Sequence, residues 1–256
     1  MSVYVYGIAR SDHPALPEKA PGVGDPPREV RVVREGGLAA LVSDCPEDLR
    51  PKRRDLLAHQ HVLTEAGGRG AVLPLRFASL SEDEETVRRV LLEHAEHYTR
   101  QLTELDGRSE YNVKAVHREE EVLRLVLSED DEARSLAERN RASGGGSYED
   151  KLRLGELLAN AVREREAYDA RRIEETLAPL AERYVPGPEG TGWLANFSFL
   201  LDREASGGFL AAVEELRKDG PHLDVQATGP LPPYSFVGRP ATGQDGQPEQ
   251  AGQPAE

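Results

Sequence analysis

Hydrophobic and polar residues alternate in three short segments near the start of the chain. The segments are residues 3–9, 30–33 and 38–43, and a period of two is the pattern of a half-buried strand. A helix is then expected from Lys52, with its apolar residues three or four apart, until Gly67 and the glycine after it end it. The opening of the chain therefore predicts strands followed by a helix.

A capping box marks the start of the next helix. Ser81 and Glu84 have the spacing at which the two side chains cap the first turn reciprocally. Apolar residues then recur every three or four positions, at Val87, Leu91, Ala95, Tyr98, Leu102 and Leu105. The pattern predicts one continuous helix that ends at Asp106 and Gly107.

Strand patterns return in the second half, over residues 110–117, 193–201 and 223–227. Between the first two, residues 119–140 predict two short helices separated at Ser128, although the apolar cluster at 122–127 fits a strand equally well. A long helix is expected after the glycine-rich loop at 143–147.

That long helix has an unusual middle. Its apolar positions stop at Val162 and resume at Ile173, and residues 163–172 between them are charged on nearly all sides. We expect this portion to form a solvated face, supported by pairs such as Asp169 with Arg172.

The order of elements predicts an α+β fold with two small domains. Residues 1–108 are expected to form an N-terminal α+β domain, because strand alternation restarts just after the helix-ending Gly107. Residues 109–237 read as strand, helices, strand, helix and strand, which indicates a ferredoxin-like domain with a helical insertion. Residues 238–256 contain no large apolar residue and are expected to be disordered.

Prolines follow the last predicted strand. Pro230, Pro232 and Pro233 lack amide donors and favour an extended backbone, so the chain is expected to leave the sheet there. Tyr234 and Phe236 come directly after them. These aromatic residues could be a clasp that fastens the chain end to the folded body, or a peptide exposed for recognition by a partner; the pattern also fits a plain proline-rich exit from an edge strand.

Composition and charge narrow the classes of function. The chain has 256 residues, 38% of them hydrophobic, and a formal net charge of −14, which repels nucleic-acid backbones. No run reaches the roughly 18 apolar residues of a membrane-spanning helix. The N-terminus has no signal-peptide pattern, and the lone Cys45 cannot form an internal disulfide. A cytoplasmic protein that binds neither nucleic acid nor membrane is expected.

Few residues suggest chemistry. Arg76 lies between Leu75 and Phe77, so we expect an internal carboxylate to hold it, with a contact to an acidic partner as the alternative. His94 and His97 are three apart on a predicted helix and could share a metal in a metal-dependent enzyme, but no clustered third ligand is apparent. No Walker loop, glycine-rich dinucleotide motif, nucleophile elbow or Cys–His motif is present, so the residues themselves offer no catalytic constellation.

Several motifs together resemble those of the gas vesicle protein GvpF/GvpL family. They are Tyr-Val-Tyr-Gly-Ile at 4–8, Leu-Ala-Ala-Leu-Val-Ser at 38–43, His-Gln-His-Val-Leu at 59–63, Val-Leu-Pro-Leu-Arg-Phe at 72–77 and Thr-Gly-Pro-Leu-Pro-Pro-Tyr-Ser-Phe-Val at 228–237. The motif residues taken as structural are Pro74, Arg76, Phe77, Gly229, Pro230, Pro232, Pro233, Tyr234 and Phe236. The chain departs from the family at Leu231, where Trp is frequent, and at Ala78, where Gly is frequent.

The resemblance implies a non-enzymatic accessory protein, without a cofactor, for assembling gas vesicles, the gas-filled protein shells of some prokaryotes. It implies contacts with the small hydrophobic shell protein and with other accessory proteins, in a chaperone-like or nucleating role. The expected location is the cytoplasm, in association with gas vesicles.

Overall fold

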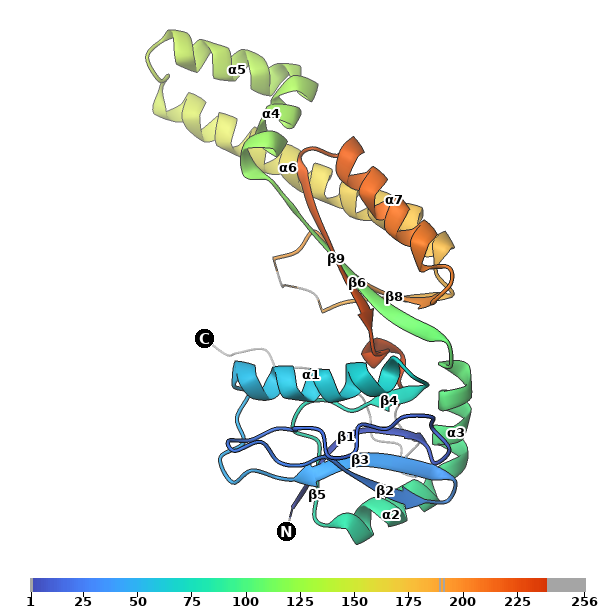
Figure 1. Cartoon of the computed structure of the whole chain (residues 1–256). Coiled ribbons are helices and arrows are strands. Elements are labelled where there is room, and N and C mark those ends of the chain that lie inside the picture. The colour runs from blue at the N-terminus through green and yellow to red at the C-terminus, as the bar shows by residue number, and fades with distance from the viewer. Residues whose placement is uncertain (1, 189, 191, 239–256) are drawn as a thin grey trace.

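The computed structural model describes residues 2–188, 190 and 192–238 (Figure 1). Its helices and strands form two antiparallel sheets with helices packed on them, which confirms the predicted α+β class. The tail predicted at 238–256 lies outside the described residues, apart from Gly238. None of the described helices is both long enough and apolar enough to cross a membrane.

The first sheet has the strand order β2-β3-β1-β4, with β5 also paired to β1. Its strands are β1 (Val3–Arg10), β2 (Arg31–Glu35), β3 (Leu38–Asp44), β4 (Val72–Pro74) and β5 (Leu80–Ser81). The strand β1 is central and buried on both sides, because Tyr4 and Tyr6 face one layer of the core while Val3 and Val5 face the other.

Helices cover both faces of this sheet. Helix α1 (Arg53–Gly67) packs with Tyr4 and Tyr6, and α2 (Glu84–Glu93) and α3 (Ala95–Glu104) pack on the opposite side. The prediction of one continuous helix from the capping box to Leu105 is wrong. The backbone leaves helical geometry at His94, and the resulting change of direction lets both helices place their apolar residues against one core.

The second sheet has the order β7-β8-β6-β9. Its strands are β6 (Arg108–His117), β7 (Arg183–Pro186), β8 (Ala195–Asp202) and β9 (Leu223–Leu231). Helix α7 (Ser206–Asp219) and the end of α6 (Tyr148–Leu177) cover one face, with Ile173, Phe199 and Phe209 in the shared core. The sequence did not predict β7, because prolines at 186 and 188 suggested only a break; as an edge strand it tolerates them.

Helices α4 (Glu119–Glu129), α5 (Asp131–Ala142) and the first half of α6 project from this sheet as a helical arm (Figure 1). The two helices expected in this region are present, and Asp130 separates them by capping α5 at the amide of Ala133 (3.0 Å). Residues 163–172 are exposed or half-buried as expected, with one exception. Asp169 in this stretch is completely buried, because polar side chains from two other elements surround it.

Candidate functional site

The strap, residues 228–238, links the two sheets. The strand β9 continues through Pro230 to Leu231, which pairs with Glu110 after a register shift in β6. The expectation that the chain leaves the sheet at its first proline is therefore wrong by two residues. Because β9 is an edge strand, the missing amide of Pro230 is tolerated there.

The strap is anchored to the second sheet through a buried carboxylate. The side chain of Glu110 accepts the Ser235 amide N–H at Oε2 (2.8 Å) and the Ser235 hydroxyl at Oε1 (2.7 Å). The same hydroxyl lies 3.0 Å from Ser198 Oγ on the neighbouring strand. Since Glu110 is only 4% exposed, these two donors supply much of what stabilises its charge.

The end of the strap contacts the first half of the chain. Phe236 and Val237 pack against the core under α2 and α3, and the Arg183 guanidinium lies 5.5 Å from the Phe236 ring centre. On α3, His97 Nε2 lies 3.2 Å from the Gly238 carbonyl oxygen. With its amide oriented to satisfy both bonds, Gln101 accepts the Gly238 N–H at 2.6 Å and donates to its carbonyl at 3.3 Å. The strap thus reaches from β9 to α3.

An aromatic cluster lies beside the strap. His59 accepts the Tyr4 hydroxyl at Nδ1 (2.8 Å) and donates from Nε2 to the Leu75 carbonyl (3.1 Å), which fixes it as the neutral Nε2–H tautomer. Burial lowers the pKa of His59 and raises that of Tyr4. Phe77 packs edge-on to His59, and the Tyr234 ring centre lies 6.5 Å from that of His59. Burial, with the nearby Glu110 carboxylate, raises the pKa of Tyr234 to about 12.

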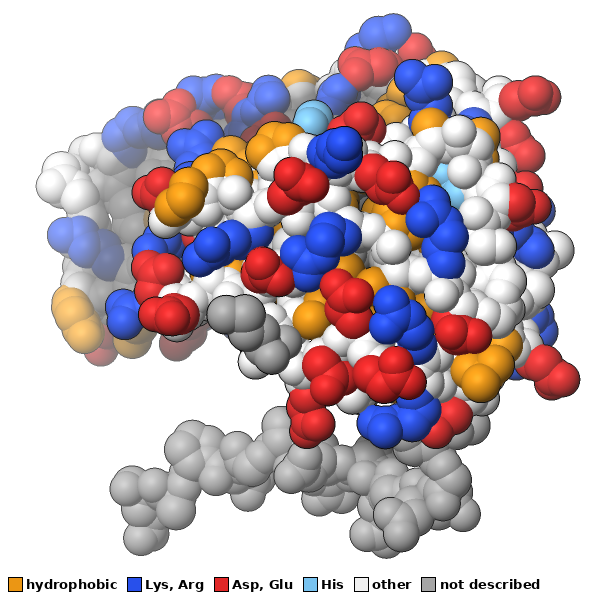
Figure 2. Space-filling model, turned by 60° about the horizontal axis from the view of Figure 1, so that its bottom comes forward, with side chains coloured by type: hydrophobic (Ala, Val, Ile, Leu, Met, Phe, Trp, Pro, Cys, Tyr) orange, Lys and Arg blue, Asp and Glu red, His pale blue; other side chains and the backbone are white. Residues whose placement is uncertain are grey.

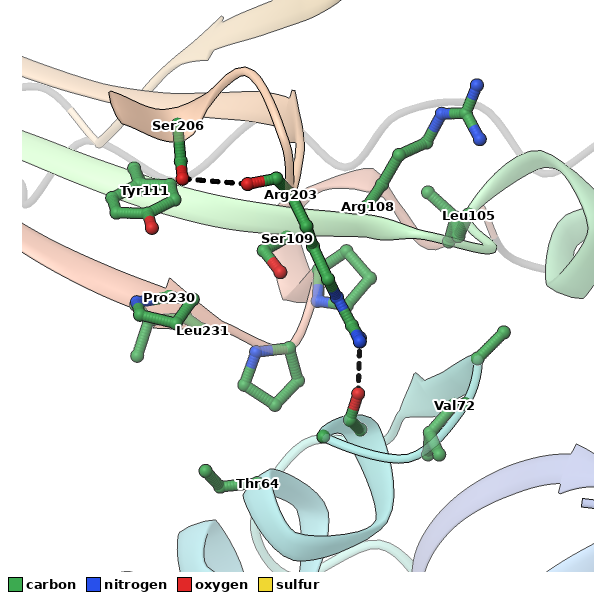
Figure 3. A pocket seen from close by; sticks show the side chains of 16 residues that line it. Thr64, Val72, Leu105, Arg108, Ser109, Tyr111, Arg203, Ser206, Pro230 and Leu231 are labelled. Atoms are coloured by element: carbon green, nitrogen blue, oxygen red, sulfur yellow. Dashed lines mark hydrogen bonds between the residues drawn. The ribbon is translucent and has the colours of Figure 1, made fainter. Parts of the chain in front are cut away.

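A cavity of 270 Å³, the junction pocket, lies where the strap passes between the sheets (Figure 3). Its walls come from the end of α1 and β4, from β6 and the start of α7, and from the strap: Thr64, Gly67, Gly68, Gly70, Ala71, Val72, Leu105, Arg108, Ser109, Tyr111, Arg203, Ser206, Pro230, Leu231, Pro232 and Pro233. Arg203 crosses it and donates to the Gly67 carbonyl at the end of α1. The pocket is therefore part of the connection between the two halves.

The motif residues predicted from the sequence lie in this region, but the environment of each side chain differs. Pro74 is buried opposite Gly7, and the Tyr111 ring lies so close to Gly229 that a Cβ there would be 2.4 Å from Cδ1. The internal ion pair expected for Arg76 is wrong: its side chain is exposed, and no carboxylate of the described residues lies within salt-bridge distance. Arg76 follows the end of β4 and begins a turn closed by Ser79, so its apolar sequence neighbours do not bury it.

A second cavity, the apolar groove, opens between the first sheet and α2. It has a volume of 360 Å³ and is lined mainly by aliphatic side chains, with polar residues at its mouth: Val5, Ile8, Ala40, Leu75, Ser79, Leu80, Ser81, Glu82, Thr86, Val87, Arg89, Val90, Leu91 and Tyr98. Leu80 at the rim is 53% exposed. Figure 2 shows the molecule turned so that its lower end in Figure 1 comes forward; hydrophobic side chains appear there only in small areas between charged ones.

The metal pair suggested by sequence is not assembled as a site. His97 bonds to Gly238, while His94 lies at the break between α2 and α3 with its ring edge-on to Tyr98. Among the described residues, the group that could hold a metal is instead His117, Asp169 and His222. No pattern in the sequence indicates this group, because its members are more than 50 positions apart.

Asp169 accepts three hydrogen bonds at one oxygen. His117 Nε2 (2.9 Å), His222 Nε2 (2.8 Å) and Arg165 Nε (2.9 Å) all contact Oδ2, while the buried Oδ1 has no partner among the described residues. Burial alone would raise the pKa of Asp169, but these three donors outweigh it and lower the pKa to about 2. The carboxylate is therefore ionised and joins α6 to the end of β6 and to the residue that precedes β9.

The fold and the strap define a class of two-sheet α+β proteins whose halves are joined by a C-terminal segment. The model of a family described as gas vesicle synthesis protein GvpL/GvpF matches residues 2–238. The chain belongs to this GvpL/GvpF family, which implies a role in gas vesicle formation and confirms the resemblance seen in its motifs.

Relatives match over nearly their full length. The chain is 59% identical to gas vesicle protein F of Streptomyces sp. strain CB03234, covering 93% of this chain and 100% of the relative. It is 30% identical to gas vesicle protein L of the same strain, covering 92% of each. The crystal structure of GvpF from Anabaena sp. PCC7120 is similar with a TM-score of 0.72 at 24% identity, covering 93% of this chain and 99% of that one. At that identity the likeness shows the fold alone.

Proposed function

We propose that this protein is a non-enzymatic accessory protein that binds the hydrophobic shell protein during gas vesicle assembly. A shell subunit with a large apolar face aggregates before assembly unless another surface covers that face. Membership of the GvpL/GvpF family supports the vesicle context. The role is chaperone-like or nucleating, in the cytoplasm at the growing vesicle, and includes contacts with other accessory proteins.

The apolar groove is the observation that carries this proposal. It combines a mainly aliphatic lining with Leu80, whose side chain is exposed. A concave apolar surface of this kind suits a short hydrophobic segment better than a flat patch does. The groove lies between β5 and α2, so helix and sheet fix its walls.

A matched pair of substitutions tests the groove. Leu80 and Leu152 are 53% and 54% exposed, and Leu152 lies on α6, far from the groove. Leu80→Glu should reduce capture of co-expressed shell protein about tenfold or more, because it places a charge against the apolar partner. Leu152→Glu should capture as the parent does. Both should keep the parental Tm, since both sites are exposed.

Equal capture by the Leu80→Glu variant and the parent would remove the groove from the proposal. If both variants lose capture, either the shell protein contacts another surface or an added negative charge weakens capture wherever it is placed. Vesicle formation in a host that lacks the parental gene provides the second readout, with the same expected order.

We also infer that the chain is organised as two domains, 1–108 and 109–237, the second ferredoxin-like. Support comes from the two separate sheets and from the strand, helices, two strands, helix and strand of the second half. Limited proteolysis should first cut near Asp106 in a variant with a weakened strap. Cleavage within β6 or β8 instead would contradict this division.

A further inference from the structure

In the cluster around Asp169, one carboxylate oxygen faces more hydrogen-bond donors than it has lone pairs. A carboxylate oxygen offers two lone pairs, yet Oδ2 is approached by three N–H groups at 2.8–2.9 Å. The other oxygen, Oδ1, is buried without a partner. Buried polar atoms usually have a hydrogen-bond partner. Here three donors share Oδ2 while Oδ1 has none, so hydrogen bonding alone does not account for this arrangement.

The ligand atoms converge from three separate elements. His117 is the last residue of β6, Asp169 lies on α6, and His222 precedes β9. Their side chains are 6%, 0% and 6% exposed, and the three ligand atoms lie within 4.8 Å of one another. Two imidazole nitrogens and one carboxylate oxygen form a donor set that suits Zn²⁺, Co²⁺, Ni²⁺ or Fe²⁺.

We propose that His117, Asp169 and His222 bind one divalent transition-metal ion, with zinc as the best fit to two imidazole nitrogens and one carboxylate oxygen. On binding, the ring proton of each histidine moves from Nε2 to Nδ1, so that Nε2 presents its lone pair to the metal instead of an N–H to Asp169. That change removes two of the three donors from Oδ2, which then ligates the metal and keeps only Arg165 as a hydrogen-bond partner. The ion joins the second half of α6 to the end of β6 and to the residue that precedes β9.

Arg165 is the group that opposes this site. Its guanidinium lies 2.9 Å from Oδ2 and 3.3 Å from His222 Nε2, so its positive charge competes with a cation. Arg165 also bonds to Glu129 at 3.3 Å, and this exposed carboxylate gives it an alternative partner when the metal is bound. Arg165 thus sets the affinity of the site without being a ligand.

The test uses the full-length protein, stripped with a chelator and titrated with zinc chloride. Calorimetry and elemental analysis should give one bound ion per chain, and a zinc excess of about a hundredfold over Kd should raise Tm by about 5 to 10 °C. Cobalt chloride should give the visible absorption of a low-symmetry site. His222→Ala should weaken zinc binding by about 100-fold or more, because one of three protein ligands is lost.

Two further variants separate this site from the rest of the molecule. Arg165→Gln should bind zinc more tightly than the parent, since the competing charge is gone, whereas a purely structural Arg165 would leave affinity unchanged or lower. The double variant His94→Ala, His97→Ala should bind as the parent does. The absence of stoichiometric zinc binding by the parent protein would overturn the proposal, and so would binding that survives in His222→Ala or that Arg165→Gln fails to strengthen.

Discussion

Replacing Ser235 with Ala removes one hydroxyl from the point where the strap meets the second sheet. That hydroxyl donates to Glu110 Oε1 at 2.7 Å and lies 3.0 Å from Ser198 Oγ, while the Ser235 amide continues to serve Oε2. The substitution leaves the backbone and the neighbouring aromatic residues in place. It therefore tests the anchoring of the strap with little change in packing.

The expected loss follows from the burial of the carboxylate. A hydrogen bond to a charged group contributes about 1.5–3 kcal/mol, more than a bond between neutral groups. Glu110 is 4% exposed, but Ser235 itself lies at the surface, where water can reach the vacated position and offset part of the loss. We expect the lower half of the range, about 1.5–2 kcal/mol, or a fall in Tm of about 3–8 °C.

Urea denaturation and calorimetry of the purified variant measure this loss without any partner present. Ser128→Ala is the matched control, because its exposed hydroxyl bonds only to the Leu125 carbonyl of its own helix, and a change below about 0.5 kcal/mol is expected. If Ser235→Ala unfolds at the same urea concentration as the parent and loses only its capture of shell protein, the strap is a recognition peptide and the clasp hypothesis is wrong.

Three other substitutions follow from the same region. Phe236→Ala should cost about 2 kcal/mol in a urea melt, because a partly buried ring that packs on the first core under Arg183 is lost; Phe236→Leu should recover most of it, and an unchanged melt would contradict the packing. Gly229→Ala should lower Tm, since its Cβ would lie 2.4 Å from the Tyr111 ring, and a neutral result would mean the ring moves freely. The pKa of Tyr234 is raised from 10.0 to about 12, so its contribution to stability is complete below pH 10.0 and lost as pH rises through about 12. Over that pH range, the free energy of unfolding should fall less in the Tyr234→Phe variant than in the parent. An equal fall in both proteins would show that ionisation of Tyr234 does not cause it.

Local patterns predicted most strands and helices of the two sheets, because each of these buries a periodic apolar face, but they did not predict β5 or β7. They failed where a distant residue decides the outcome. Asp169 was taken for part of a solvated face because its sequence neighbours are charged, yet His117 and His222 enclose it from more than 50 positions away. The spacing of residues along a helix or strand does not reveal a contact between residues so far apart in the sequence.

Two other errors came from reading neighbours in sequence as neighbours in space. Arg76 was expected to be buried between Leu75 and Phe77, but β4 has already ended at Pro74 and the chain is turning. Pro230 was expected to end its strand, although at a sheet edge an absent amide removes no hydrogen bond. The sequence singled out the residues of the strap motif, and His59 only as part of the motif at 59–63, whereas it indicated neither the anchoring by Glu110 nor the apolar groove.

The strap returns to the same helix that leads into the second sheet. The chain first crosses between the halves from α3 to β6, and it crosses back when Gly238 reaches His97 on α3. A single connection would let the two halves twist relative to each other, and the second connection restricts that twist. From these two connections we expect the helical arm and the apolar groove to turn together, so that a force applied at the tip of the arm also rotates the groove.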